Sequence, residues 1–196
     1  MAQEGDLQYQ VVDVRGRADI YRDETDETSR LHKGQKVNDE DSITTETKSE
    51  VVLRLKGKAY LHISQNTKVH ITRLQWSEGK GVQCKIHLNK GRVLIQMDKA
   101  ANPSFEVLAG KILCRGHGKI FEVYKKKDEV RVTAFEGSVV TNSHGHVEMA
   151  KTHQVMKYDS AKFRYKHYLK AEDEGRLEEW TNHLGDIREK HPPTKR

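Results

Sequence analysis

The sequence predicts an all-β fold of stacked antiparallel strands, sandwich-like or solenoid-like, followed by an amphipathic C-terminal helix. From Gln8 to about Met156, short runs alternate between apolar and polar side chains, and Gly, Asn or Asp separates one run from the next. These turn residues recur roughly every 8 to 12 residues, a spacing typical of sandwiches, barrels and solenoids. No stretch before residue 157 shows three turns of helical period, so a parallel sheet with helical crossovers is not expected.

The composition favours a domain with two thin layers. The chain has 196 residues, of which 35% are hydrophobic, and its 14 glycines add little apolar mass. A parallel sheet covered by helices on both faces would need more. The net charge of +6 mildly favours anionic partners, but both signs alternate along most of the chain, as on an ordinary solvated surface.

Nothing in the sequence predicts a membrane span or a secretory signal. No run approaches the roughly 18 apolar residues that cross a bilayer, and the start MAQEGDLQYQ has neither the charged nor the apolar region of a leader. We therefore expect a soluble chain, which is either cytoplasmic or exported with its leader removed.

The expected strands follow one another with turn residues between them. The longest apolar stretch, 49–64, carries Val51, Leu53 and Leu55 on one face, because strand side chains alternate, and Gly57 divides the stretch in two. In chain order the expected strands are residues 8–16, 31–37, 42–46, 49–64, 66–71, 82–88, 92–97, 104–110, 111–116, 119–124, 129–137, 138–141 and 146–149.

The chain is expected to divide into an all-β domain, a helical segment and a frayed tail. Past Met156 the β-branched residues become rare, and the final HPPTKR cannot continue a helix. The expected bounds are 8–156 for the β domain, 157–190 for the helical segment and 191–196 for the tail.

Within the helical segment we expect a helix from about Glu172 to Lys190. Gly175 and Gly185 each weaken it by about 1 kcal/mol relative to Ala, so it should be stable only when buried against the β domain or a second copy. Its apolar residues recur at spacings of three and four and form one stripe. This stripe, a candidate for partner binding, consists of Leu177, Trp180, Leu184 and Ile187.

The stretch RGHGKIFEV, residues 115–123, has the glycines of a phosphate-binding loop but not its spacing. A P-loop requires a glycine five residues before Gly118 and a hydroxyl residue after Lys119, and the sequence has Leu113 and Ile120. The dinucleotide pattern also fails, because a strand follows where a helix is needed. We therefore expect no nucleotide and no other cofactor.

No metal site is predicted from the sequence. His144, His146 and His153 lie close along the chain, but Asn142 to His146 is better explained as a hairpin turn. His62 and His70 face the polar sides of neighbouring strands and are expected to form a cross-strand polar pair if they converge.

The two cysteines and the acidic loop also lack a recognisable site. Cys84 and Cys114 both lie in strand-like runs, so buried thiols are expected, with one cross-strand disulfide as the alternative. The acidic loop that begins at Asp23 lacks the Gly and Glu of an EF-hand. A nucleophile elbow is missing as well, so no catalytic activity is expected.

The densest basic cluster in the β region is a second candidate for partner binding. It lies between two expected strands, where charge ordinarily protects a sheet edge, and an anionic partner is the alternative. Nucleic acid is not favoured, because aromatic residues make up only 7% of the chain and no strand carries a stacking platform. The cluster consists of Lys125, Lys126, Lys127 and Arg131.

The order of these strands and turns resembles the FecR family of bacterial extracytoplasmic domains, over about residues 10–156. The most specific match is the family's R-G-T-x-F-x-V block, present here as Arg115 to Val123 and followed by Phe135-Glu136-Gly137. His117 stands where the family has Thr, and the link to Phe121 is longer. The resemblance implies that glycines 116 and 118 turn the chain into a strand whose Phe121 points inward, and that Gly137 closes the next turn.

The resemblance implies a non-catalytic binding or scaffold module outside the cytoplasm, which holds a protein or a cell-wall polymer. Sigma-factor regulation is not expected, because the chain shows neither the N-terminal cytoplasmic segment nor the membrane helix of such regulators. Two alternatives stay open: a polysaccharide-cleaving enzyme using Glu122 and Glu136, and a cytoplasmic nucleic-acid binder using the aromatic and basic run 157–170. Self-association through the helix is also possible.

Overall fold

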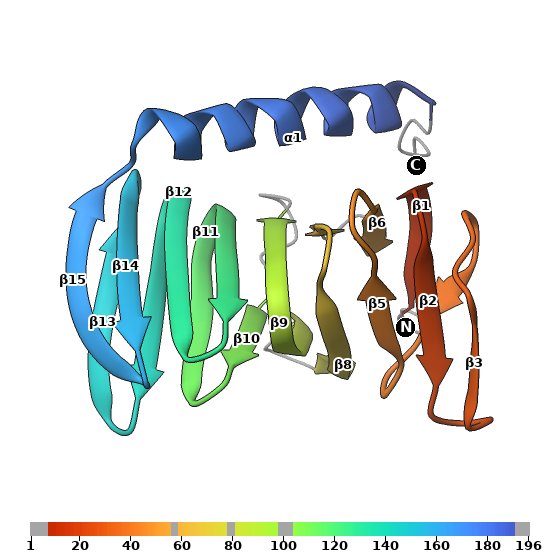
Figure 1. The fold of residues 1–196 in the computed structure, drawn as a ribbon, viewed down its shortest axis with the longest axis horizontal. Coiled ribbons are helices and arrows are strands. Elements are labelled where there is room, and N and C mark those ends of the chain that lie inside the picture. The colour runs from red at the N-terminus through yellow and green to blue at the C-terminus, as the bar shows by residue number, and fades with distance from the viewer. Residues whose placement is uncertain (1–7, 56–58, 78–80, 98–103, 191–196) are drawn as a thin grey trace.

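The computed structural model describes residues 8–55, 59–77, 81–97 and 104–190, and it confirms the all-β prediction (Figure 1). Fifteen strands of these ranges form one mixed sheet, and a single C-terminal helix follows them. The elements are β1 (Tyr9–Arg15), β2 (Ala18–Arg22), β3 (Glu27–Arg30), β4 (Lys36–Val37), β5 (Ser42–Thr45), β6 (Glu50–Leu55), β7 (Ala59–Ile63), β8 (Lys68–Ser77), β9 (Gly81–Met97), β10 (Ser104–Ala109), β11 (Ile112–Lys126), β12 (Glu129–Ser143), β13 (His146–Lys151), β14 (Gln154–Asp159), β15 (Lys162–Tyr168) and α1 (Ala171–Lys190).

The sheet folds over on itself into two layers. In one layer, which we call the helix-side layer, the order is β15, β14, β12, β11, β9, β7, β6, β1 and β4. In the other, the far layer, the order is β13, β12, β11, β10, β9, β8, β5, β2 and β3. The long strands β9, β11 and β12 belong to both layers and connect them. All strand pairs are antiparallel except β9 with β10, which the sequence did not predict.

The main core fills the space between the two layers. Alternation along β6 sends Val51, Leu53 and Leu55 into this core, as predicted. Phe121 of β11 also points inward, as the resemblance implied, and Val123 lies in the same core. The division of the stretch 49–64 at Gly57 lies outside the described residues. Cys84 and Cys114 are buried in the same core as free thiols, so the disulfide alternative is wrong.

Glycines mark the place where β11 and β12 bend from one layer into the other. Gly118 lies opposite Gly137, and the pairing slips by one residue just after Gly118. Gly137 has a φ of 97°, a conformation that suits glycine. Gly116 and Gly118 therefore bend a continuous strand, and Gly137 lies inside β12; the implied turn at Gly137 is wrong.

Replacing Gly118 by alanine should destabilise the fold by about 1 to 3 kcal/mol, the usual cost of overpacking. The new Cβ would lie 2.5 Å from the Gly137 Cα and 2.8 Å from the Glu136 carbonyl oxygen, and these backbone atoms cannot move aside cheaply. Gly175→Ala is the matched control: its Cβ meets open space on α1, so it should stabilise by up to about 1 kcal/mol. Urea unfolding of both variants checks the opposite signs, and equal effects would contradict this account.

The helix α1 runs along the whole stack of strands, from the β14–β15 end to the β1 end (Figure 1). It begins one residue earlier than expected. Asp173 accepts a hydrogen bond from the Lys170 backbone N–H at 3.1 Å, and acidic residues fill the first turn of the helix. Both features stabilise a helix N-terminus. Within the described residues, no helix has both the length and the apolar character needed to cross a bilayer.

The expected change from strand to helix after Met156 is wrong. Strands β14 and β15 continue the sheet to Tyr168, and the helix starts at Ala171. The run 157–168 is rich in Lys, Arg and Tyr and has few aliphatic residues, because β15 is an edge strand with mostly exposed side chains. The expected tail 191–196 lies outside the described residues.

Candidate functional site

Helix α1 covers the outer face of the helix-side layer, and the apolar residues between them form a second hydrophobic cluster apart from the main core. The stripe predicted from the sequence lies on this face: Trp180, Leu184 and Ile187 are buried, and Leu177 is partly buried. From the sheet side they meet outward-pointing residues of four strands. These are Val12, Val52, Leu94 and Phe135.

A network of buried charges occupies the N-terminal half of the same surface. Glu122 on β11 is only 2% exposed. One of its oxygens lies 3.3 Å from Arg176 Nη2 of α1, and the other lies 3.6 Å from Arg92 Nη1 of β9. Arg176 Nη2 also donates to Asp173 Oδ1 at 2.5 Å, and Arg131 Nη1 of β12 donates to the same oxygen at 3.2 Å. The helix is therefore held by charge to β11 and β12, and Arg92 connects β9 to the same network through Glu122.

The contacts of the network favour the ionised forms of Asp173 and Arg176 in spite of burial. Burial alone would raise the pKa of Asp173, but hydrogen bonds from Arg176, Lys170 and Arg131 outweigh it and lower that pKa. Burial would lower the pKa of Arg176, but Glu122 and Asp173 outweigh it and raise that pKa. These groups therefore act as a fixed ionic contact at neutral pH.

Two histidines and two carboxylates lie close together between the C-terminal half of α1 and the sheet. His183 of α1 and His62 of β7 are 7% and 8% exposed, and their rings lie 6.2 Å apart, edge to face. His183 Nε2 lies 2.8 Å from Asp13 Oδ2, and His183 Nδ1 lies 3.9 Å from Glu50 Oε2. The same Glu50 oxygen lies 3.6 Å from His62 Nε2. We call Asp13, Glu50, His62 and His183 the histidine cluster.

The predicted basic cluster is divided by the structure. Lys126 and Lys127 are exposed at the β11–β12 turn, and Lys125 donates to the Lys127 carbonyl oxygen at 3.0 Å. Arg131 points the other way, under α1, where Asp173 pairs with it. The three lysines remain candidates for contact with a partner, and Arg131 has a structural role in this arrangement.

The carboxylate pair weighed for glycan cleavage is not brought together as a site. Glu122 is held in the buried network described above. Glu136 makes a salt bridge with Lys119 beside the bend of β11 and β12. Each carboxylate is paired with a cationic side chain, and these ion pairs connect neighbouring elements of the fold.

One of the histidine pairings considered from the sequence does not form. His70 lies in the far layer, where it contacts Ser42 and Glu40, so it does not converge with His62. His144 lies in the β12–β13 turn, as expected, and His146 pairs with Glu148. The pairing that does form, between His62 and His183, joins residues far apart in the sequence and had no local signal.

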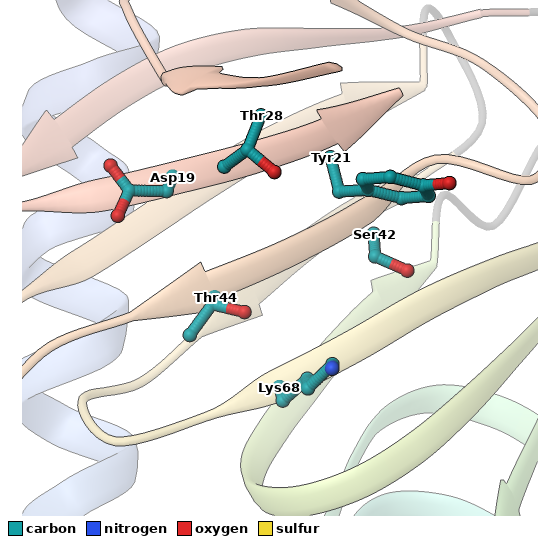
Figure 2. A pocket seen from close by; sticks show the side chains of 6 residues that line it. All are labelled: Asp19, Tyr21, Thr28, Ser42, Thr44 and Lys68. Atoms are coloured by element: carbon teal, nitrogen blue, oxygen red, sulfur yellow. The ribbon is translucent and has the colours of Figure 1, made fainter. Parts of the chain in front are cut away.

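A shallow hollow of about 410 Å³ lies on the outer face of the far layer (Figure 2). It is lined by side chains of β2, β3, β5 and β8 that are short and polar apart from one tyrosine and one lysine. It opens widely to solvent and contains a single acidic and a single basic side chain, so it lacks a convergent catalytic arrangement. The lining residues are Asp19, Tyr21, Thr28, Ser42, Thr44 and Lys68.

One end of the sandwich has two unpaired strand edges and exposed apolar side chains. Among the described strands, β15 pairs only with β14, and β13 pairs only with β12. The two edges lie side by side, because Lys166 of β15 contacts Glu148 of β13 at 3.4 Å. We call this region the open end. Its large exposed hydrophobic residues are Val147, Met149, Tyr165 and Tyr168, which are 58%, 43%, 49% and 72% exposed.

Comparison with known proteins relates this architecture to one family. A family model described as FecR protein matches residues 41–140, just over half of the chain. Two solved structures, each of a protein described as a "putative anti-sigma factor" from Parabacteroides distasonis ATCC 8503, are similar, with TM-scores of 0.57 and 0.54 and 13% identity. Each match covers 71% of this chain, and the chain spans 63% and 64% of those proteins. A search of curated proteins found no match.

Proposed function

The chain belongs to the FecR family, and from this premise we propose that it is a non-catalytic binding module of the bacterial envelope that holds a protein partner along its open end. The observation that carries the proposal is the pair of free strand edges, β13 and β15, with four large apolar side chains exposed beside them. A free edge offers backbone N–H and C=O groups to an added strand; these main-chain hydrogen bonds give such pairing its affinity, and the neighbouring side chains give it specificity.

The chemistry of β15 favours an extended and acidic peptide. Lys162, Arg164 and Lys166 alternate along it with aromatic residues, and all three are exposed. Lysines on an edge also hinder pairing between two copies of the same basic strand, since like charges would face each other. A partner of opposite charge does not meet that obstacle. The net charge of +6 acts in the same direction at longer range.

The family and the solved neighbours support a role in passing information between proteins of the envelope. The neighbours described as anti-sigma factors share the two-layered fold over most of this chain. A module of that kind needs a surface for another protein, and the open end supplies one. The family resemblance supports a location outside the cytoplasm, and a cell-wall polymer is the alternative ligand to be tested.

Photo-crosslinking in the native host tests the proposal. A benzophenone amino acid at Tyr168, the most exposed aromatic residue of the open end, should form a discrete protein adduct in the envelope fraction. The matched control places the same group at Thr28, which is exposed on the edge strand β3 of the far layer. Adducts at Thr28 and none at Tyr168 would contradict the proposal.

The same assay separates the alternative ligands. An adduct at Tyr168 that nuclease removes would instead indicate the nucleic-acid binder, whose binding should also weaken steeply with salt. Cosedimentation with purified peptidoglycan without any protein adduct would indicate the cell-wall polymer. Cytoplasmic fractionation of the protein would contradict the envelope location.

A further inference from the structure

We propose that Glu50, His62 and His183 bind a zinc ion and that this ion fastens α1 to the sheet. The three residues come from β6, β7 and α1, and each offers one ligand atom. These atoms all lie within 4.8 Å of one another. A single ion at this point would join the helix to two neighbouring strands of the helix-side layer.

The first argument is that His62 has a buried nitrogen with no hydrogen-bond partner. Its Nε2 is inaccessible to solvent and unpaired among the described residues, although the side chain is directed at Glu50. The 3.6 Å separation from Glu50 Oε2 is too long for a hydrogen bond. A buried polar atom without a partner is unfavourable, so a ligand bound to Nε2 would stabilise this arrangement.

The second argument is the tautomer that Asp13 imposes on His183. At 2.8 Å, Asp13 Oδ2 accepts the proton of His183 Nε2, and in the neutral imidazole this leaves the lone pair on Nδ1. Nδ1 faces Glu50 Oε2 at 3.9 Å, where a lone pair and a carboxylate repel unless a positive charge lies near them. A carboxylate that orients a ligating histidine through its other nitrogen is the usual support of zinc sites.

The third argument is the match between the donor set and the metal. Two imidazoles and one carboxylate form a set that zinc uses, with bonds about 2.0 to 2.2 Å long, which puts neighbouring ligand atoms of a tetrahedral site roughly 3.3 to 3.5 Å apart. The observed 3.6 Å and 3.9 Å from Glu50 Oε2 to the two imidazole nitrogens need only a small contraction, and the two nitrogens, which lie within 4.8 Å of each other, have to approach to the same spacing. Magnesium and calcium prefer oxygen ligands in larger numbers, so they fit poorly. Water would complete the four ligands.

The surroundings are compatible with a cation at this point. The Trp180 ring packs 5.2 Å from the His62 ring and shields the cluster from one side. Arg15 is the nearby positive charge: its Nε lies 3.5 Å from Asp13 Oδ2, and its side chain is 55% exposed. It therefore competes for Asp13, which orients His183, and it also faces Glu50, its cross-strand partner in the β1–β6 pair, so a zinc ion has to displace Arg15 from one of the three proposed ligands.

Zinc titration of metal-stripped, full-length protein purified without a polyhistidine tag tests the site. We expect one zinc ion per chain by calorimetry, and cobalt should give the absorption of a tetrahedral site. His62→Gln and His183→Gln should each abolish this binding. Asp13→Asn, which keeps all three ligands, should weaken it about 10- to 100-fold. Glu50→Gln, at a half-exposed position, removes a ligand with little risk to folding and should also lose the site.

Control variants and a second measurement distinguish a site at the cluster from zinc bound elsewhere. His70→Gln and the double variant His144→Gln with His146→Gln should bind zinc as the wild type does. If zinc binds only when α1 is docked, amide exchange of 171–187 should slow about 100-fold at free zinc 100 times the Kd. Absence of binding to the wild type, binding that survives in the His62 and His183 variants while they remain folded, or unchanged exchange with zinc bound would each overturn the proposal.

Discussion

Trp180→Ala should release α1 from the sheet while the two-layered sandwich stays folded. Trp180 is 4% exposed and lies at the centre of the cluster formed with Val52, Leu94 and Phe135. Truncating a buried Trp costs about 3 to 5 kcal/mol. The lower end applies here, because the indole Nε1 has no hydrogen-bond partner among the described residues and its burial already carries a penalty.

The released helix should also unfold. It carries Gly175 and Gly185 in its interior, and isolated helices of this length are marginal in water even with better sequences. We therefore expect lost helical circular dichroism and fast amide exchange throughout 171–187, with the amides of β9, β11 and β12 still protected.

Glu179→Ala is the matched control, because Glu179 is the exposed neighbour of Trp180 on the same helix. It should change the free energy of unfolding by no more than about 0.5 kcal/mol and leave exchange of α1 slow. Slow exchange in Trp180→Ala would mean that the charge network alone holds the helix. Release that depends on protein concentration would instead point to self-association, the alternative weighed from the sequence.

The strands were predictable because their signal is local. Alternation along β6 and β10 and the turn residues between strands follow from the chemistry of adjacent positions. The stripe of α1 was predictable for the same reason. The bend of β11 was less so: glycines 116 and 118 looked like a turn because a corner between two layers and a tight turn need the same backbone freedom.

The covered face left a signal that alternation analysis does not use. Val12 and Val52 each follow another valine, so one residue of each pair points away from the main core. Leu94 and Phe135 also occupy positions whose side chains point away from the main core. Adjacent apolar residues in a strand indicate that both of its faces are buried. The sequence therefore contained evidence of a covering element for these strands, and the stripe of α1 was the matching surface.

The histidine cluster and the charge network had no such signal. His62 and His183 stand 121 positions apart, and Arg131 and Asp173 stand 42 apart. The docking of α1 across the strands brings each pair together, so these contacts depend on the tertiary arrangement and not on any spacing in the chain. For the same reason Arg131 looked like part of a surface cluster with Lys125 to Lys127.

Glu122→Gln should have the second largest effect on stability. The side chain keeps its size but loses the charge that Arg176 and Arg92 face at 3.3 Å and 3.6 Å. Removing one member of a buried ionic contact leaves the others uncompensated, at about 3 to 5 kcal/mol. We expect about 3 kcal/mol, since both arginine side chains are roughly a quarter exposed and Arg176 retains Asp173. Urea unfolding measures this loss, and amide exchange of 171–187 shows whether it falls on α1.

A double-mutant cycle with Arg176→Gln tests whether the cost comes from the charges left behind. Once Arg176 is replaced by a neutral residue, Glu122→Gln takes away a smaller electrostatic interaction. The double variant should therefore lose less free energy of unfolding than the sum of the two single variants, by about 0.5 to 3 kcal/mol. Arg164→Gln is the control, because its contact with Asp159 joins two side chains that are each 49% exposed, and loss of such a pair costs about 0 to 1 kcal/mol. Additive effects in the cycle, or a loss with Glu122→Gln no larger than with Arg164→Gln, would mean that the apolar stripe alone docks the helix and that the buried charges only set its register along the sheet.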